Sequence, residues 1–235
     1  INVSVPTGNF GNILAAYYAK HMGLPISKLI CASNDNKVLF DFFQTGTYDK
    51  NREFYLTNSP AMDILISSNL ERLLYIITNN NEELVSKLMI DLKEKGKFTL
   101  PEEYQDRLND FMSYSVTKEE TVTAINDCYK KYNYLIDPHT AVGYKAYEVL
   151  KDKLNGKTVV VSTASPFKFV ETVNEVFNYD LENLELINKI AEETSLEVPS
   201  ILSDIYNFEY DKVIWKKEEM ETNLRKLIGE IDENC

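Results

Sequence analysis

The sequence has 235 residues, of which 44% are hydrophobic, and its 37 acidic and 25 basic residues give a formal net charge of −12. This length allows one sizeable domain or two small ones, and the composition is that of an ordinary globular protein. The acidic balance excludes nucleic acids and anionic membrane surfaces as expected partners, because both require clustered Lys and Arg side chains.

The first third of the chain alternates between strand and helix. A short apolar strand over residues 1–5 leads through a Gly/Asn turn at residues 7–12 into an expected helix over residues 13–22. Residues 28–33 form a second apolar strand, and a short helix is expected over residues 38–44. Strand, turn, helix and strand in this order predict a βαβ unit on a parallel sheet.

The middle of the chain is acidic and mainly helical. Apolar residues recur there at helical spacing, which is the main signal for amphipathic helices. A short strand is expected at residues 111–116, and helices are expected at residues 67–78, 82–95, 101–111 and 118–132. We interpret the region near residues 80–133 as a helical insertion between elements of the sheet.

The last third combines one more strand with several helices. The β-branched run at residues 158–162 predicts a strand that is buried on both faces. Helices are expected at residues 140–154, 168–177, 181–196 and 216–231. The whole pattern predicts an α/β fold with an open, mainly parallel sheet and flanking helices. Because Ile1 leads straight into an apolar strand, we expect the chain to be a fragment.

The cysteines are few and scattered, at Cys31, Cys128 and Cys235. Their spacing predicts neither a disulfide framework nor a zinc site, so we expect a cytoplasmic protein without a metal. No apolar run reaches the length of a membrane span, and no signal peptide is visible.

The turn at residues 7–12 reads Thr-Gly-Asn-Phe-Gly-Asn between a strand and a helix. Backbone N–H groups at such a junction converge at the positive end of a helix dipole and can hold an anion. The run has no Lys for a nucleoside-triphosphate loop and no third glycine for a dinucleotide fingerprint. A cradle for one phosphate monoester fits best, and a purely structural turn capped by Asn side chains is the alternative.

Four motifs then resemble threonine synthases, in the order in which that family has them. They are Ser4-Val5-Pro6-Thr7-Gly8-Asn9-Phe10-Gly11-Asn12-Ile13-Leu14-Ala15; the pair Ser59-Pro60-Ala61-Met62-Asp63-Ile64 and Ser67-Ser68-Asn69-Leu70-Glu71-Arg72-Leu73; Asp137-Pro138-His139-Thr140-Ala141-Val142-Gly143; and Ser162-Thr163-Ala164-Ser165-Pro166-Phe167-Lys168-Phe169.

The resemblance implies a pyridoxal 5'-phosphate enzyme of fold type II, like the tryptophan synthase β subunit. It implies that Gly8, Asn9, Phe10, Gly11 and Asn12 hold the cofactor's phosphate and that the Thr163 hydroxyl lies near the pyridine nitrogen. A hydroxyl at that position would not hold the pyridine nitrogen strongly protonated.

The sequence also departs from the family at three positions. Many relatives have Asp where this chain has Asn12. This difference changes the side chain at that position and leaves the backbone cradle intact. Ser165 stands where the family usually has His, and Phe167 stands where it usually has Ala.

By the same resemblance, residues 1–235 correspond to the C-terminal portion of the large domain, which binds the cofactor phosphate. The intact enzyme would convert O-phospho-L-homoserine and water to L-threonine and phosphate. The lysine that forms the Schiff base, in a Phe-Lys-Asp context, is expected in an N-terminal portion absent from this chain, and Lys168 is not its counterpart. We therefore expect no catalytic residue here and an inactive isolated chain.

Two other functions remain open on the sequence. The chain could come from another fold type II enzyme, such as a cysteine or tryptophan synthase relative, or from a phosphate-binding protein without catalysis. The second and third motifs favour threonine synthase over the former.

Several polar residues within the motifs allow a structural reading. Asp137 and Pro138 predict a helix start with His139 in its first turn, and His139 could alternatively line the mouth of the site. Ser68 and Glu71 predict a capping box rather than an anion site. Arg72 is expected to make internal contacts, with Asp63 and Glu71 as candidate partners. His21 is expected at the surface near a helix end.

Overall fold

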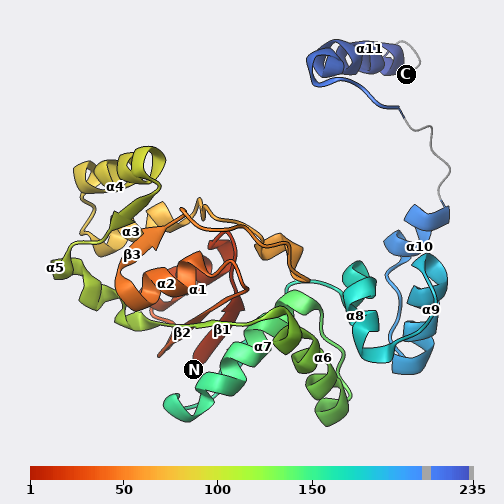
Figure 1. Cartoon of the computed structure of the whole chain (residues 1–235), viewed down its shortest axis with the longest axis horizontal. Helices are drawn as coiled ribbons and strands as arrows, with labels where there is room; N and C mark the ends of the chain where they lie inside the picture. Colours follow the sequence, from red (N-terminus) through yellow and green to blue (C-terminus); the bar gives the residue numbers. More distant parts are fainter. Residues whose placement is uncertain (208–212, 233–235) are drawn as a thin grey trace. The chain divides into compact units, whose positions relative to one another are not determined.

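The computed structural model describes residues 1–207 and 213–232, which form two compact units, residues 1–198 and 199–235 (Figure 1). The first unit contains a four-stranded sheet in the order β5-β2-β1-β6, in which every neighbouring pair is parallel. Its strands are β1 (Asn2–Pro6), β2 (Leu29–Ser33), β5 (Phe111–Ser115) and β6 (Thr158–Val160). The predicted α/β class with a mainly parallel sheet is confirmed.

The helices of the first unit cover both faces of this sheet. Helix α1 contacts β1 and β2, and α2 contacts β2 and β5. Helix α7 contacts all four strands and packs against α6, beside which it lies in Figure 1. The bounds are α1 (Gly11–His21), α2 (Val38–Thr45), α3 (Leu70–Ile77), α4 (Glu82–Lys95), α5 (Glu102–Gln105), α6 (Lys118–Tyr132), α7 (Pro138–Leu150), α8 (Val170–Phe177) and α9 (Asn183–Thr194).

Alternation along β2 shows that the two layers lie on opposite faces. Leu29 and Cys31 belong to the larger core with α1 and α2, whereas Ile30 and Ala32 belong to a smaller core with Val142 of α7. Successive side chains of a strand point to opposite faces, so each face receives alternate residues. The near-continuous apolar run of β2 is therefore explained by burial on both sides.

Strand β6 departs from the sequence-based expectation. It lies at the edge of the sheet, where it pairs only with β1, and the Val159 side chain is 49% exposed. The prediction that this strand is buried on both faces was wrong. A β-branched run indicates a strand, but its position within the sheet depends on partners distant in sequence.

Two short strands were not predicted. Strand β3 (Thr47–Asp49) pairs antiparallel with β4 (Lys97–Thr99), and the rings of Tyr48 and Phe98 stack with centroids 5.5 Å apart. Residues 80–133 contain the helices α4, α5 and α6 and the strands β4 and β5. Strand β5 belongs to the main sheet.

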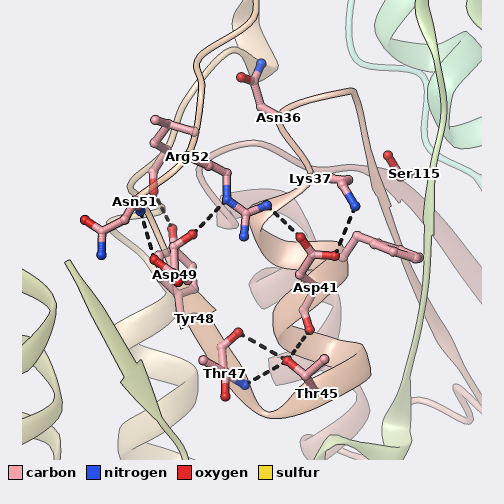
Figure 2. Close-up of polar contacts among 12 residues, drawn as sticks. Asn36, Lys37, Asp41, Thr45, Thr47, Tyr48, Asp49, Asn51, Arg52 and Ser115 are labelled. Carbon is pink, nitrogen blue, oxygen red and sulfur yellow. Dashed lines mark hydrogen bonds and ion pairs between the residues drawn. The ribbon is translucent and has the colours of Figure 1, made fainter. Parts of the chain in front are cut away.

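Ion pairs tie α2 to the chain that follows β3. The Arg52 guanidinium donates to Asp41 of α2 over 2.6 Å and to the backbone oxygen of Asp49 over 2.9 Å, and Lys37 pairs with the same Asp41 carboxylate (Figure 2). These side chains are partly exposed, so the network fixes a loop rather than forming a polar core.

The second unit is helical where it is described. It contains α10 (Ser200–Asn207), which was not predicted, and α11 (Met220–Asp232), which begins four residues later than expected. No helix in the described residues is long and apolar enough to cross a membrane.

Candidate functional site

A cavity of about 310 Å³ lies where β1 ends and α1 begins. Its wall contains residues 8–12 of the strand-to-helix turn and Thr163 from the segment after β6. All six residues predicted to bind the cofactor therefore line the same cavity. Ligands of proteins commonly occupy the carboxyl ends of parallel strands in this way, in pockets of about 300–1,000 Å³.

Phe10 gives the turn its shape. Its backbone has a left-handed conformation with φ of 64°, which is unusual for a bulky side chain. The ring is 1% exposed, stacks against Phe43 and packs at a tilt against Phe111 in the larger core. Core packing of the ring thus holds a strained turn in place, as is common at ligand sites.

The backbone of this turn offers hydrogen-bond donors. Within the described residues, the N–H groups of residues 8–12 have no acceptor from the protein, and they precede or begin α1. The first N–H groups of a helix are unpaired by geometry and lie at its positive end. A dianionic phosphate monoester fits this donor set better than a cation or an apolar group would.

The Thr7 hydroxyl does not add to these donors. It donates to the Val5 carbonyl over 2.7 Å, while the Thr7 N–H donates to Ala32 of β2. Thr7 therefore anchors the start of the turn to the sheet. Asn12 is exposed in the first turn of α1.

The segment before α3 braces the turn from outside. Ser67 donates to the Gly8 carbonyl over 3.0 Å, the Ser68 N–H and hydroxyl both donate to Asn9 Oδ1, and the Asn69 amide donates to the Asn9 carbonyl over 2.7 Å. The predicted Ser68–Glu71 capping box was wrong, because Ser68 is engaged with Asn9 and the N-cap of α3 is Asn69.

The brace is itself anchored in the core. The buried Tyr48 hydroxyl accepts from the Ser67 N–H over 2.8 Å and donates to the Leu65 carbonyl over 3.1 Å. Burial raises the pKa of Tyr48 to about 12, so the hydroxyl remains protonated and keeps both bonds. The unpredicted strand β3 thus contributes to the site.

Gly8 allows a close approach by the 3-10 turn η1 (Pro60–Met62). A Cβ atom at Gly8 would lie 3.0 Å from Met62 Cα and 3.1 Å from the Ala61 carbonyl. Because both contacts are backbone, a side chain at this position would force the turn and η1 apart.

The Thr163 segment forms the opposite part of the wall. The Thr163 N–H donates to Thr140 Oγ1 over 3.3 Å, and within the described residues its hydroxyl has no partner. Ser165, which replaces the usual His, accepts from the Phe167 N–H and starts η4 (Pro166–Phe169). Phe167 is buried, so this departure from the family is accommodated by core packing.

Lys168 also lines the cavity. Its side chain is exposed, and the ammonium lies 5.5 Å from the centre of the Phe169 ring. Lys168 therefore lies at the surface and beside the cavity. A positive charge there favours an anionic ligand.

His139 has both of the roles that the sequence left open. It lies in the first turn of α7, where Asp137 accepts from the N–H groups of His139 and Thr140 as the predicted N-cap. Its side chain is also buried against the cavity wall. Sequence patterns favoured only the helix start, since the packing of the ring depends on η1 and η4.

Other polar predictions were corrected or left outside the cavity. Arg72 donates to Asn69 Oδ1 over 2.6 Å, whereas Asp63 accepts from Thr57 and Asn34. Arg72 is exposed and, within the described residues, pairs with neither Asp63 nor Glu71, so the expected internal contact was wrong. His21 is exposed in the last turn of α1, as expected.

Several residues at the cavity were not singled out as site residues from the sequence, among them Ala61, Met62 and Asn69. Ala61 and Met62 belong to the second family-like motif, which was the available signal, but they contribute backbone and packing rather than reactive groups. Among the described residues, no group of three or more His, Cys, Asp or Glu side chains could hold a metal ion.

Comparisons with known proteins agree with these motifs. Residues 140–211 match the family model described as "Threonine synthase, C-terminal". The chain is 40% identical to threonine synthase of Saccharomyces cerevisiae over 214 residues, covering 82% of this chain and 42% of that protein. It is 44% identical to threonine synthase-like 1 of Macaca fascicularis over 178 residues, covering 74% of this chain and 23% of that protein.

Solved structures show the same fold. The yeast threonine synthase structure superposes with a TM-score of 0.84 at 33% identity, over 99% of this chain and 48% of that one. The pyridoxal-phosphate-bound threonine synthase of Brucella melitensis gives 0.81 at 35% identity, over 96% and 46%. The chain thus spans less than half of the relatives it matches, and its resemblance to the C-terminal portion of threonine synthases, enzymes of fold type II, is confirmed.

Proposed function

We propose that this chain is the cofactor-phosphate-binding, C-terminal portion of a threonine synthase. The whole enzyme would convert O-phospho-L-homoserine and water to L-threonine and phosphate in the cytoplasm. The observation that carries the proposal is the single cavity that unites residues 8–12 with Thr163, at the places where the family-like motifs predict the two ends of pyridoxal 5'-phosphate.

The residues present fit that cofactor. The unpaired N–H groups of residues 8–12 and the N-terminus of α1 would bind its phosphate. The Thr163 hydroxyl would face its pyridine nitrogen, and Lys168 would add positive charge at the cavity. When bound, the cofactor supplies an electron sink for carbanions of the substrate.

The chain's own residues would bind and orient rather than transfer protons. A threonine hydroxyl is a neutral partner for the pyridine nitrogen, so Thr163 would position the ring without fixing a proton on it. The catalytic lysine and the groups that bind the substrate's phosphate and carboxylate would come from the N-terminal portion of the same enzyme.

The decisive experiment uses the protein encoded by the whole gene. We expect it to release inorganic phosphate and form L-threonine from O-phospho-L-homoserine in the presence of pyridoxal 5'-phosphate. Replacing Gly8 by Val should abolish this activity, because the Cβ would separate the turn from η1. Absence of both products, with the cofactor bound, would refute the threonine synthase assignment.

A second function is kept because the chain is equally similar to proteins named threonine synthase-like 1. Such a protein could bind the cofactor without acting on O-phospho-L-homoserine. Assaying the whole protein with O-phospho-L-homoserine, L-serine and O-acetyl-L-serine distinguishes these two functions. Product from L-serine or O-acetyl-L-serine, and none from O-phospho-L-homoserine, would favour another fold type II enzyme.

The absence of the catalytic lysine from this chain is tested separately. Borohydride reduction of the isolated chain with pyridoxal 5'-phosphate should label no specific lysine. Stoichiometric labelling of Lys168, detected by mass spectrometry, would contradict the proposal, since Lys168 lines the same cavity.

A further inference from the structure

The Asp137 carboxylate is buried at the first turn of α7, with 0% of the residue exposed. It accepts from the N–H of His139 over 2.9 Å, from His139 Nδ1 over 3.0 Å, from the N–H of Thr140 over 3.3 Å and from the Thr140 hydroxyl. A buried carboxylate needs this many donors to remain ionised, because burial alone disfavours the charge.

The His139 ring connects this carboxylate to η1. Its Nε2 atom accepts from the Ala61 N–H over 3.1 Å, so the hydrogen-bond network assigns the ring proton to Nδ1, which donates to Asp137. Both ring nitrogens are therefore engaged within the protein. In this arrangement neither nitrogen is directed at a ligand, although the residue lines the cavity.

Packing against an aromatic side chain also holds the His139 ring in place. The His139 ring packs against the Phe169 ring of η4, with centroids 4.5 Å apart. The Lys168 ammonium lies over the same Phe169 ring. His139 thus contacts elements from three parts of the sequence: α7, η1 and η4.

The same network reaches both parts of the cavity wall. On one side, Ala61 and Met62 lie directly against Gly8 of the phosphate cradle. On the other side, Thr140, whose hydroxyl donates to Asp137, accepts from the Thr163 N–H. One buried carboxylate therefore links the two segments that would hold opposite ends of the cofactor.

We propose that Asp137 and His139 form a positioning bridge that sets the separation between the phosphate cradle and the Thr163 segment. The inference rests on the proposed cofactor site, and it gives a role in that site to two residues that would not touch the cofactor's reacting atoms. A ligand that spans both ends should depend on the bridge, whereas a ligand that occupies only the cradle should not.

Two ligands test this distinction on the 235-residue chain. Inorganic phosphate occupies the cradle alone. Pyridoxine 5'-phosphate spans the cavity and has an alcohol in place of the aldehyde, so it cannot react with surface lysines. Dissociation constants for both are measured from the amide signals of Gly8 and Gly11 in ¹H–¹⁵N spectra.

We expect His139→Ala to weaken binding of pyridoxine 5'-phosphate about tenfold and to change phosphate binding less than threefold, since a tenfold change corresponds to about 1.4 kcal/mol. His139→Gln, whose amide oxygen can still accept from Ala61, should recover part of the loss. His21→Gln is the matched control, because His21 is the only other histidine and is exposed on α1.

A second measurement keeps the test valid if His139→Ala does not fold. With only two histidines, the ¹⁵N spectrum of the imidazoles can be assigned, and the His139 ring should carry its proton on Nδ1 at neutral pH. A proton on Nε2 would overturn the bridge, because the Ala61 N–H would then have no acceptor.

The remaining outcomes separate the two proposals. If the wild-type chain binds pyridoxine 5'-phosphate and folded His139→Ala binds it equally well, the bridge is refuted and the cofactor site stands. If the variant loses phosphate and pyridoxine 5'-phosphate to the same extent, His139 supports only the cradle and the bridge is again refuted. If the wild-type chain binds neither ligand, the bridge has no ligand to position and is refuted, while the proposed function is still decided by phosphate release from O-phospho-L-homoserine with the whole protein.

Discussion

The Phe10 ring stacks against the Phe43 ring with centroids 5.9 Å apart, although the Phe10 backbone has a positive φ of 64°. The buried ring therefore offsets the cost of a left-handed conformation, which is about 1–2 kcal/mol for a non-glycine residue. The shape of the proposed phosphate cradle depends on the aromatic core beneath it.

Replacement of Phe10 tests this balance. Phe10→Ala should lower the free energy of unfolding by about 3–5 kcal/mol, as for other buried phenylalanines. Phe10→Gly should be no less stable than Phe10→Ala, because glycine adopts a positive φ without strain. Urea unfolding of both variants measures the difference. A Gly variant less stable than the Ala variant by the usual ~1 kcal/mol would show that the backbone is not left-handed here.

Gly143 tests the packing of α7 on the sheet. A Cβ at this position would lie 3.1 Å from Pro6 Cδ, and the Gly143 carbonyl accepts from the Ser4 hydroxyl over 2.7 Å. Gly143→Ala should therefore destabilise the chain by about 1–3 kcal/mol, although alanine favours a helix over glycine. Thermal unfolding gives the comparison.

The control for this change is Gly229→Ala. Gly229 lies on the exposed side of α11, where a Cβ would have no neighbour within 4 Å. This substitution should leave stability unchanged or raise it by up to about 1 kcal/mol. Equal destabilisation by both substitutions would contradict the close contact between α7 and β1.

Asp137 should make stability depend on pH in the acid range. Burial raises the pKa of Asp137, but hydrogen bonds from His139 and Thr140 together lower it by more. The net pKa therefore lies below its ordinary value of 3.8. A depressed pKa in the folded state contributes stability above the unfolded pKa, and this contribution is lost as pH falls through the folded value.

The stability difference between the wild type and Asp137→Asn should therefore be largest from about pH 5 upwards and should shrink below about pH 4. Urea unfolding at pH 7, 5 and 3 measures it. A difference that stays constant over this range would mean that the carboxylate's charge contributes nothing to folding.

Cys31 should be unreactive in the folded chain. It is 0% exposed in β2, and burial raises its pKa to about 12. Thiol reagents attack the thiolate, so labelling at pH 8 should require unfolding. In a variant with Cys128 and Cys235 replaced by Ala, rapid labelling without denaturant would show that β2 is accessible.

Much of the local structure was predictable because its signals are local. The bounds of α4 and α6 match the expected ranges, since Asn81 and Thr117 cap these helices and a left-handed residue ends each of them. The β3–β4 pair was missed because its strands are about fifty residues apart and each is only three residues long. The edge position of β6 was missed because the sequence of a strand does not specify which other strands pair with it.

The amino-acid sequence by itself determined the α/β class, the glycine turn at the end of β1 and the six candidate cofactor residues. These features can be recognised in the sequence because periodicity, turn chemistry and motifs are properties of short segments. Only the tertiary structure decided that Thr163 and the turn share one cavity, that Ser68 braces Asn9 instead of capping α3, and that His139 joins Asp137 to Ala61. These contacts require η1, α7 and η4 to meet, and packing between distant segments sets that meeting rather than any local preference.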